Sequence, residues 1–344
     1  MKEQYFRKEI EEVLKKYPVG DMIQIERMPT GKMNDNFSIE TTTGKFLIKR
    51  HHLNIGMMKK DWLMRQQKTL SILSRNGVKV IPGIKTTRRA TVVEKNNARY
   101  VIYPFVENYP PKEITLAQIK DAAENLAMFH KQTKRIKINI TYRRLRPWPR
   151  LDGFISSFYN GRKRAGEKSP LKLLAKKKNK DSYDQYIEEN IPFFNALKKI
   201  IIMAQKRIKY PDMTLIHYDY QPANLLYDKE GKIIAIIDFD QVHKNLMQID
   251  LIKAVRFFAM DKTQTKIDFK IAKTFIQSYL QSNPIQLRGE DIIDFLIVQV
   301  TRRLYYMLEI YYNHGGEIVK DLSRKDLETA KFILKNREKL KNLV

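Results

Sequence analysis

Short runs in which apolar and polar residues alternate occupy much of the first hundred positions of the chain. They are rich in β-branched and aromatic residues and lie at 21–28, 36–42, 45–50, 88–95 and 99–107. Such runs predict strands, and a Thr-Gly turn at Thr43 and Gly44 predicts that the second and third form an antiparallel hairpin. The beginning of the chain is therefore expected to fold as a small antiparallel meander.

A helical period follows the third predicted strand. In the segment 57–77, Leu63, Leu70 and Leu73 recur at spacings that place them on one face of a helix, and Gly77 is placed to end it. We predict that residues 1–108 form a lobe in which a small sheet packs with this one helix.

The pattern becomes mostly helical after a boundary near residues 108–111. Apolar residues line one helical face from Ile119 to Phe129, and helical patterns return at 181–210 and 246–344. A predicted β-hairpin interrupts this half of the chain, with arms at 224–228 and 232–238. The expected fold is α+β, with a sheet-rich lobe at 1–108 and a larger, mostly helical lobe at 109–344.

Composition limits the classes of protein that fit this pattern. The chain has 344 residues, of which 43% are hydrophobic and 30% charged, as is ordinary for a folded protein of two lobes. It contains no cysteine, which excludes disulfides, thiolate nucleophiles and sulfur-ligated zinc. Because no apolar run approaches the roughly 20 residues of a membrane span and the chain starts without a signal core, we expect a soluble, cytoplasmic protein.

Positive charge is concentrated in one part of the chain. The formal net charge is +27, and residues 131–180 hold 17 Lys and Arg against the two acids Asp152 and Glu167, a local balance of +15. Such a field attracts polyanions, including nucleic acid, anionic surfaces and acidic polymers. The alternative is a solvated, lysine-rich face without a partner. A role in nucleic-acid binding would rest on charge alone, since no binding motif accompanies it.

Three oxygen-bearing side chains follow apolar runs in the second half of the chain. Asp219 comes after the run ending at His217, Asn224 begins one arm of the predicted hairpin, and Asp238 ends the other arm. The hairpin is expected to bring Asn224 and Asp238 together at its open end, with Asp219 beside them. Amide and carboxylate oxygens suit Mg²⁺ completed by phosphates and water, as phosphoryl transfer from ATP requires.

The stretch HxDxxxxN, formed by His217, Asp219 and Asn224, and the strand ending in Ile237-Asp238 resemble the loops of a known family. They are similar to the catalytic and metal loops of the aminoglycoside phosphotransferase and choline kinase family, a branch of the protein-kinase-like fold. Within it, "HYDYQPANLL", "IIDFDQVHKNLMQIDLIKAV" and a helical insert at about 150–210 resemble the CotS-type spore-coat kinase-like proteins. The resemblance covers nearly the whole chain and implies two lobes, ATP and Mg²⁺.

The resemblance also implies roles for individual residues. Asp219 would orient or deprotonate the acceptor hydroxyl, and Asn224 and Asp238 would bind Mg²⁺. Lys49, at the end of the third predicted strand, resembles the lysine that contacts the α and β phosphates of the nucleotide.

Supporting positions follow from the same resemblance. Backbone groups from Tyr103 to Phe105 resemble the hinge that receives the adenine edge. Asp250 resembles the aspartate that braces the catalytic loop, although as a residue near a helix start it could instead be an N-cap. We interpret His217 as a buried structural histidine of the loop.

Two features depart from the pattern of active kinases. The strand lysine usually pairs with a glutamate on the following helix, yet between Arg50 and Val93 the only acid is Asp61. Gln66 or Gln67 falls near the expected position and is predicted to hydrogen-bond Lys49 beside the nucleotide. The phosphate-covering turn, which is usually rich in glycine, contains only Gly31.

Asp240 has two interpretations. It could be a second metal ligand or a solvent-facing acid, and we favour the latter.

Two classes of function remain open. The leading hypothesis is an ATP- and Mg²⁺-dependent phosphotransferase acting on a hydroxyl of a small molecule, sugar or spore-coat component, either in the cytoplasm or incorporated into the coat. Aminoglycosides are disfavoured as acceptors because they are polycations and the chain is strongly basic. The alternative is a non-catalytic, kinase-like scaffold of the spore coat, which the missing helix glutamate favours.

Overall fold

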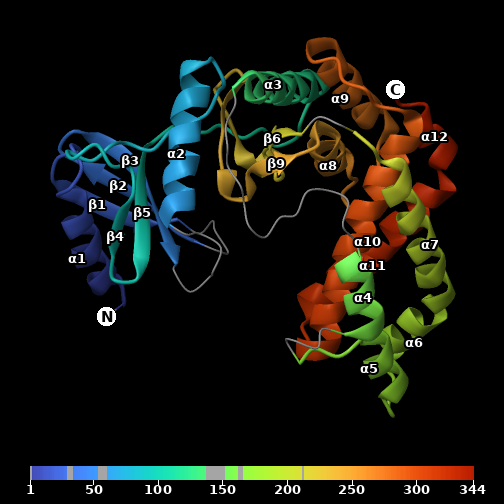
Figure 1. Ribbon diagram of the computed structural model, residues 1–344. Coiled ribbons are helices and arrows are strands. Elements are labelled where there is room, and N and C mark those ends of the chain that lie inside the picture. The colour runs from blue at the N-terminus through green and yellow to red at the C-terminus, as the bar shows by residue number, and fades with distance from the viewer. Residues whose placement is uncertain (1, 29–33, 53–59, 137–151, 162–165, 211–212) are drawn as a thin grey trace.

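The computed structural model describes residues 2–28, 34–52, 60–136, 152–161, 166–210 and 213–344. Within these ranges the fold is the predicted α+β, kinase-like one, with a sheet-rich N-terminal part beside a largely helical part (Figure 1). The predicted phosphate-covering turn at Gly31 and much of the basic stretch 131–180 lie outside the described residues. The exact division at 108/109 stays a prediction.

The N-terminal sheet is antiparallel and has five strands in the order β1-β2-β3-β5-β4. Its strands are β1 (Met22–Arg27), β2 (Asn34–Thr41), β3 (Gly44–His52), β4 (Val93–Lys95) and β5 (Ala98–Pro104). Thr41 pairs with Gly44, so the β2–β3 turn consists of Thr42 and Thr43, one residue earlier than predicted. The fourth strand is shorter than its predicted run at 88–95.

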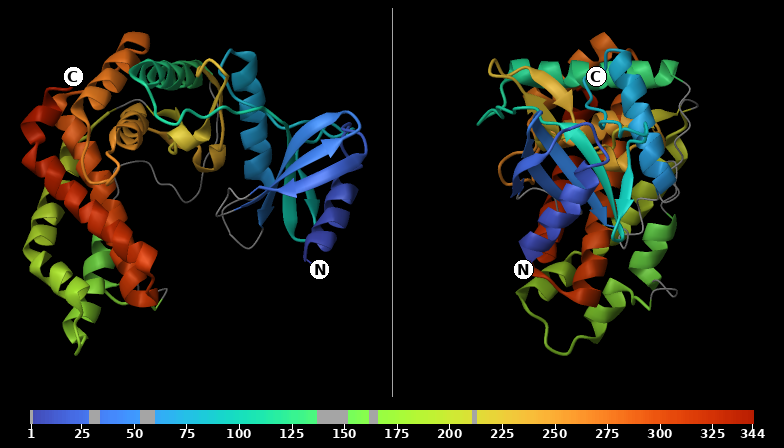
Figure 2. Two further views of the ribbon diagram at one scale, coloured as in Figure 1. Left: turned by 180° about the vertical axis from the view of Figure 1, so that it is seen from behind. Right: turned by 90° about the vertical axis from the view of Figure 1, so that its left-hand side faces the viewer.

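Two helices cover this sheet on opposite faces (Figures 1 and 2). The predicted helix is present as α2 (Lys60–Arg75), whereas α1 (Lys2–Leu14) is an addition to the single helix expected in this part of the chain. It forms because Ile10, Val13 and Leu14 bury one face of an otherwise charged segment against the sheet. Side chains of α2 instead belong to the core that runs through the helical part.

The helical part contains the remaining helices and two short two-stranded sheets. Its α-helices are α3 (Leu116–Arg135), α4 (Asp152–Asn160), α5 (Pro170–Lys176), α6 (Ser182–Glu189), α7 (Ile191–Arg207), α8 (Met247–Ala259), α9 (Phe269–Ser282), α10 (Gly289–His314), α11 (Glu317–Lys335) and α12 (Arg337–Lys341). Strands β6 (Thr214–Ile216) and β9 (His243–Asn245) pair, as do β7 (Leu225–Tyr227) and β8 (Ile233–Ile236). The β7–β8 pair is the predicted hairpin.

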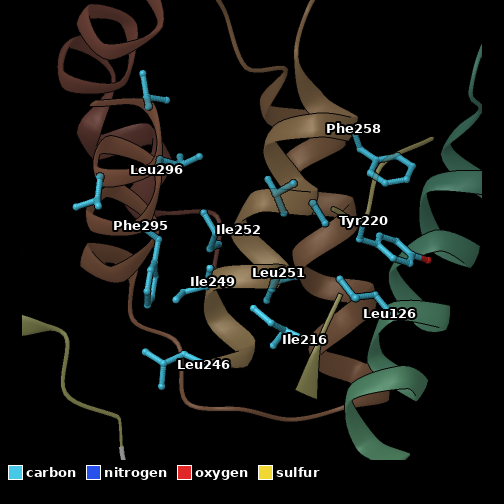
Figure 3. Packing of buried hydrophobic residues seen from close by; sticks show 14 of the residues in the cluster. Leu126, Ile216, Tyr220, Leu246, Ile249, Leu251, Ile252, Phe258, Phe295 and Leu296 are labelled. Carbon is cyan, nitrogen blue, oxygen red and sulfur yellow. The ribbon is translucent and has the colours of Figure 1, made fainter. Parts of the chain in front are cut away.

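Helix α8 lies at the centre of the helical part. Figure 3 shows Ile249 and Ile252 directed toward Phe295 of α10, while Leu251 lies beside Ile216 of β6. All five of these side chains are essentially excluded from water. Side chains at the start of α8 are therefore held rigidly against β6, the strand that leads into the loop of Asp219.

No described helix combines the length and apolar character needed to cross a membrane.

Candidate active site

The loop that carries Asp219 begins at the buried His217. The backbone N–H of Asp219 donates to Nδ1 of His217 (3.2 Å), and Nε2 of His217 lies 2.9 Å from the carbonyl of Ile237. Since Nδ1 accepts, Nε2 carries the proton and donates to that carbonyl. Burial lowers the pKa of His217, so the neutral ring links the Asp219 loop to the strand that leads to Asp238.

A buried carboxylate lies beneath the same loop. The two oxygens of Asp250 accept the backbone N–H groups of His217 (2.7 Å) and Tyr218 (2.8 Å), and one of them lies 3.0 Å from Nε2 of His130. Burial acts to raise the pKa of Asp250, but the hydrogen bond and charge of His130 outweigh it and hold the pKa below its usual range. Tyr218 is thereby fixed at a φ of +66°, a conformation costly for a residue with a side chain.

Asp250 is not a helix N-cap. Helix α8 begins at Met247 with Leu246 as its N-cap, so Asp250 lies inside the first turn and directs its carboxylate to the loop instead. Of the two readings left open by the sequence, the geometry matches the brace.

Asp219 and Asn224 are in direct contact. The side-chain N–H₂ of Asn224 donates to the carbonyl of Asp219 (2.8 Å) and lies 3.2 Å from its carboxylate, which also accepts from Gln221 (3.2 Å). Among the described residues no group donates to the amide oxygen of Asn224. The amide nitrogen is thus used within the loop while the oxygen remains available for a ligand.

The β7–β8 hairpin brings Asn224 close to Asp238, as its pattern predicted. The N–H of Ile237 donates to the carbonyl of Asn224 (2.9 Å), and Asp238 follows with a left-handed φ of +62°. The side chain of Asp238 is 41% exposed. One amide oxygen and one partly exposed carboxylate fit Mg²⁺, which is typically held by one or two protein oxygens together with phosphates and water. No cluster of three His, Cys, Asp or Glu suited to a metal occurs in the described ranges.

Lys49 reaches this site from strand β3. Its Nζ lies 3.0 Å from Asp238 and 2.7 Å from Asp240, and Asp240 also accepts from Asn34 (2.7 Å). Burial on its own lowers the pKa of Lys49, but the charges of Asp240 and Asp238 outweigh it and raise the pKa above its usual range. Asp240 is therefore a partly buried partner of Lys49, and the solvent-facing interpretation of it was wrong.

Gln66 does not contact Lys49 as predicted. It is 2% exposed; its Nε2 donates to the carbonyl of Phe239 (2.8 Å), and its Oε1 accepts from Gln67 (3.0 Å). Gln67 also donates to the hydroxyl of Tyr103 (2.8 Å). Gln66 thus holds the backbone between Asp238 and Asp240 and does not bond Lys49, and Gln67 supports Gln66. A contact of Gln66 with nucleotide stays a prediction.

The predicted hinge range Tyr103 to Phe105 lies at the end of strand β5. The N–H of Phe105 donates to the carbonyl of Lys45 on β3 (3.2 Å), and Tyr103 pairs with Leu47. Because backbone groups of an antiparallel strand alternate in direction, those of Pro104 are directed away from β3. The Pro104 carbonyl is therefore the group of this range that β3 does not use, and its contact with adenine stays a prediction.

Sequence reasoning missed three functional contacts of this site. They are the Asp240–Lys49 pair, the bond from His130 to Asp250, and the contact of Lys253 on α8 with Tyr218. Each joins residues far apart in the chain, and no local pattern signals them.

Comparison with known proteins places this geometry in a family. Residues 24–285 match the sequence model described as "APH: Phosphotransferase enzyme family". The chain is 22% identical to homoserine kinase of Caulobacter vibrioides over 299 residues, which is 86% of this chain and 84% of that protein.

Solved structures of kinases share the fold. A microcompartment-associated aminopropanol kinase superposes with a TM-score of 0.69 at 16% identity, covering 98% of this chain and 100% of that one. Spectinomycin phosphotransferase in complex with ADP and spectinomycin gives 0.64 at 17% identity, covering 98% of each chain. The family model spans well over half of the sequence, and the chain therefore belongs to the APH phosphotransferase enzyme family.

Proposed function

We propose that this protein transfers the γ-phosphoryl group of ATP to a hydroxyl of a small molecule, with Mg²⁺ as cofactor. The observation that carries the proposal is the convergence of Lys49, Asp219, Asn224 and Asp238 from the N-terminal sheet, a braced loop and a hairpin. Strained backbone at Tyr218 and Asp238, on either side of this site, supports it because such strain concentrates at functional sites.

In this proposal Asp219 accepts the proton of the acceptor hydroxyl while the hydroxyl oxygen attacks the γ-phosphorus. The new O–P bond forms as the bond from the γ-phosphorus to the β,γ-bridging oxygen breaks, and ADP leaves. Asn224 Oδ1 and Asp238 would hold the metal, which neutralises charge on the phosphate oxygens when bound. His217 and Asp250 act as structural support by fixing the loop.

The pairing of Lys49 supports an active site despite the missing helix glutamate. In kinases that glutamate keeps the strand lysine directed at the phosphates. Here Asp240 lies 2.7 Å from Lys49 and is itself fixed by Asn34. We infer that Asp240 positions Lys49 in place of the glutamate, and that Gln66 supports it by holding the Phe239 carbonyl.

The metal proposal predicts that Asp238→Asn raises the Mg²⁺ concentration for half-maximal phosphoryl transfer by at least about tenfold, since loss even of outer-shell support costs that much. The measurement is ADP release at saturating ATP across a Mg²⁺ titration. An unchanged Mg²⁺ dependence would remove Asp238 from the metal site.

The lysine-positioning proposal predicts a different signature for Asp240→Asn. We expect KM for ATP to rise by about tenfold, equivalent to about 1.4 kcal/mol, because Lys49 loses its nearest carboxylate. Mg²⁺ dependence should move far less than in Asp238→Asn. Asp228→Asn, on the same hairpin, is the matched control. Equal KM values for wild type and Asp240→Asn would contradict the role.

The class of acceptor that we propose is narrower than the one shown for the family. The names of related proteins include homoserine, aminopropanol and spectinomycin. Because the chain has a net charge of +27, it should repel a polycation. We therefore propose an anionic or neutral acceptor, such as a sugar or another polyol, rather than an aminoglycoside. Binding of an acidic polymer or coat protein through residues 131–180 also stays a proposal, and there Lys177 and Lys180 already pair with Asp184 and Glu188.

The spore-coat assignment is a further proposal, with phosphorylation of a coat component as its active form and a scaffold without turnover as its alternative. Titration calorimetry with ATP and Mg²⁺ separates the two forms. Absence of binding at millimolar nucleotide would leave only the scaffold. Binding accompanied by acceptor-dependent ADP release supports the enzyme.

A further inference from the structure

Two cations contact the residue that directly precedes Asp219. Lys253 of α8 donates to the carbonyl of Tyr218, and its Nζ lies 3.8 Å from the centroid of the Tyr218 ring. Arg302 of α10 donates to the Tyr218 hydroxyl (3.1 Å). Tyr218, Lys253 and Arg302, here called the Tyr218 cluster, are only partly buried, so each keeps some accessible surface.

The two cations of the Tyr218 cluster are not held in direct ion pairs. In the part of the chain that the structure describes, neither Lys253 nor Arg302 forms an ion pair with a carboxylate, although the charges of Asp219 and Asp250 act on Lys253 without direct contact. The neighbouring cations behave differently, because Arg256 and Arg303 both bind Asp326 of α11, at 2.9 and 2.6 Å. The helices α8 and α10 thus place one pair of cations in a structural ion-pair network and leave the other pair beside the catalytic loop.

The surroundings of Lys253 favour binding of an anion. The pKa of Lys253 is lowered to about 8, chiefly by burial and also by the charges of Arg256 and Arg302, against the opposing charges of Asp219 and Asp250. Its nearest ring partner other than Tyr218 is Phe257, at 5.5 Å. A partly desolvated cation with aromatic neighbours gains most from an oxyanion that can accept its hydrogens.

We propose that the acceptor carries an oxyanion group, a carboxylate or a phosphate, and that Lys253 and Arg302 bind it while Asp219 faces the reacting hydroxyl. This rests on the proposed phosphotransferase function and names its substrate class. Tyr218 directly precedes Asp219 in the chain, so Lys253, which donates to the Tyr218 carbonyl, lies beside the loop of Asp219. The expected acceptor joins a hydroxyl to an oxyanion, as a hydroxy acid or a polyol phosphate does.

The test compares alcohols that differ only in charge. With the full chain and Mg²⁺ plus a non-hydrolysable ATP analogue, affinities are measured for 4-hydroxybutyrate against 4-hydroxybutyramide, glycerol 3-phosphate against glycerol, and 3-amino-1-propanol as the cationic member. We expect at least one anion to bind about tenfold or more tightly than its neutral partner, as charge-assisted hydrogen bonds would give. The two pairs separate a carboxylate from a phosphate ligand.

Charge variants assign the effect to the cluster. Arg302→Glu should abolish the anion preference and favour the amine, whereas Arg302→Lys should retain the preference for anions. Lys262→Glu is the control. It makes the same change of charge at a side chain that is 96% exposed.

Three outcomes overturn the inference: no anion preference in wild type, no anion binding at millimolar concentration, or an anion preference that survives Arg302→Glu. Binding of the nucleotide analogue is measured first, since its absence contradicts the proposed function itself. Nucleotide binding with indifference to acceptor charge contradicts only the substrate class.

Discussion

Asp219→Asn is expected to lower the rate of phosphoryl transfer by about 10²–10⁴-fold, the usual contribution of a positioned general base. The amide has nearly the same shape as the carboxylate and can still accept one of the bonds from Gln221 and Asn224, which lie 3.2 Å from Asp219 Oδ2. The loop should therefore keep its conformation while losing the group that we propose takes the hydroxyl proton. Binding of ATP with Mg²⁺ should change by less than about threefold, since less than 1 kcal/mol is at stake.

The measurement pairs single-turnover kinetics with nucleotide titration on the same preparations. Asp321→Asn serves as a control for the substitution itself, because Asp321 is 61% exposed on α11 and pairs with Lys325 four residues along the same helix. Equal transfer rates for wild type and Asp219→Asn would remove Asp219 from the chemistry. A parallel loss of nucleotide binding would instead make it a structural residue.

Local patterns were sufficient to predict much of this fold. Alternation in 36–42 and 45–50 predicted the β2–β3 hairpin, and the two apolar arms around Gly231 predicted β7–β8 with Asn224 and Asp238 at its open end. These predictions succeeded because neighbouring strands joined by a short turn encode their own pairing. Helix α1 was not predicted, because its few apolar residues are dispersed among charged residues. Its buried face is evident only from its contact with the sheet.

The contacts that define the site were beyond such reasoning. Asp240 pairs with Lys49 across 191 positions, and His130 meets Asp250 across 120. Active kinases pair the strand lysine with a glutamate on the following helix, whereas here a carboxylate from the loop after β8 pairs with Lys49. Gln66 illustrates the same limit: its position near the site was predicted, but the carbonyl that it contacts depends on tertiary packing.

Asp250→Ala is expected to destabilise the protein by about 3–5 kcal/mol, the range for breaking a buried charged pair. The Asp250 carboxylate is fully buried, and its removal leaves the backbone N–H groups of His217 and Tyr218 without an acceptor. Asp268→Ala is the matched control, because Asp268 caps α9 by accepting the backbone N–H of Ile271 (3.0 Å). Loss of an ordinary cap costs about 1 kcal/mol, so urea unfolding should separate the two variants clearly.

The pH dependence of stability tests whether the effect of Asp250 is electrostatic. The variant for this test is Asp250→Asn, which keeps the shape of the side chain and removes its charge. The folded-state pKa of Asp250 is lowered, so its charge contributes stability above the unfolded value of about 3.9, and that contribution is lost as pH falls through the folded-state pKa. The gap between wild type and Asp250→Asn should therefore be full near neutrality and shrink with increasing acidity. A gap that is independent of pH, or no larger than that of Asp268→Ala, would show that Asp250 braces the catalytic loop through packing and not through its charge.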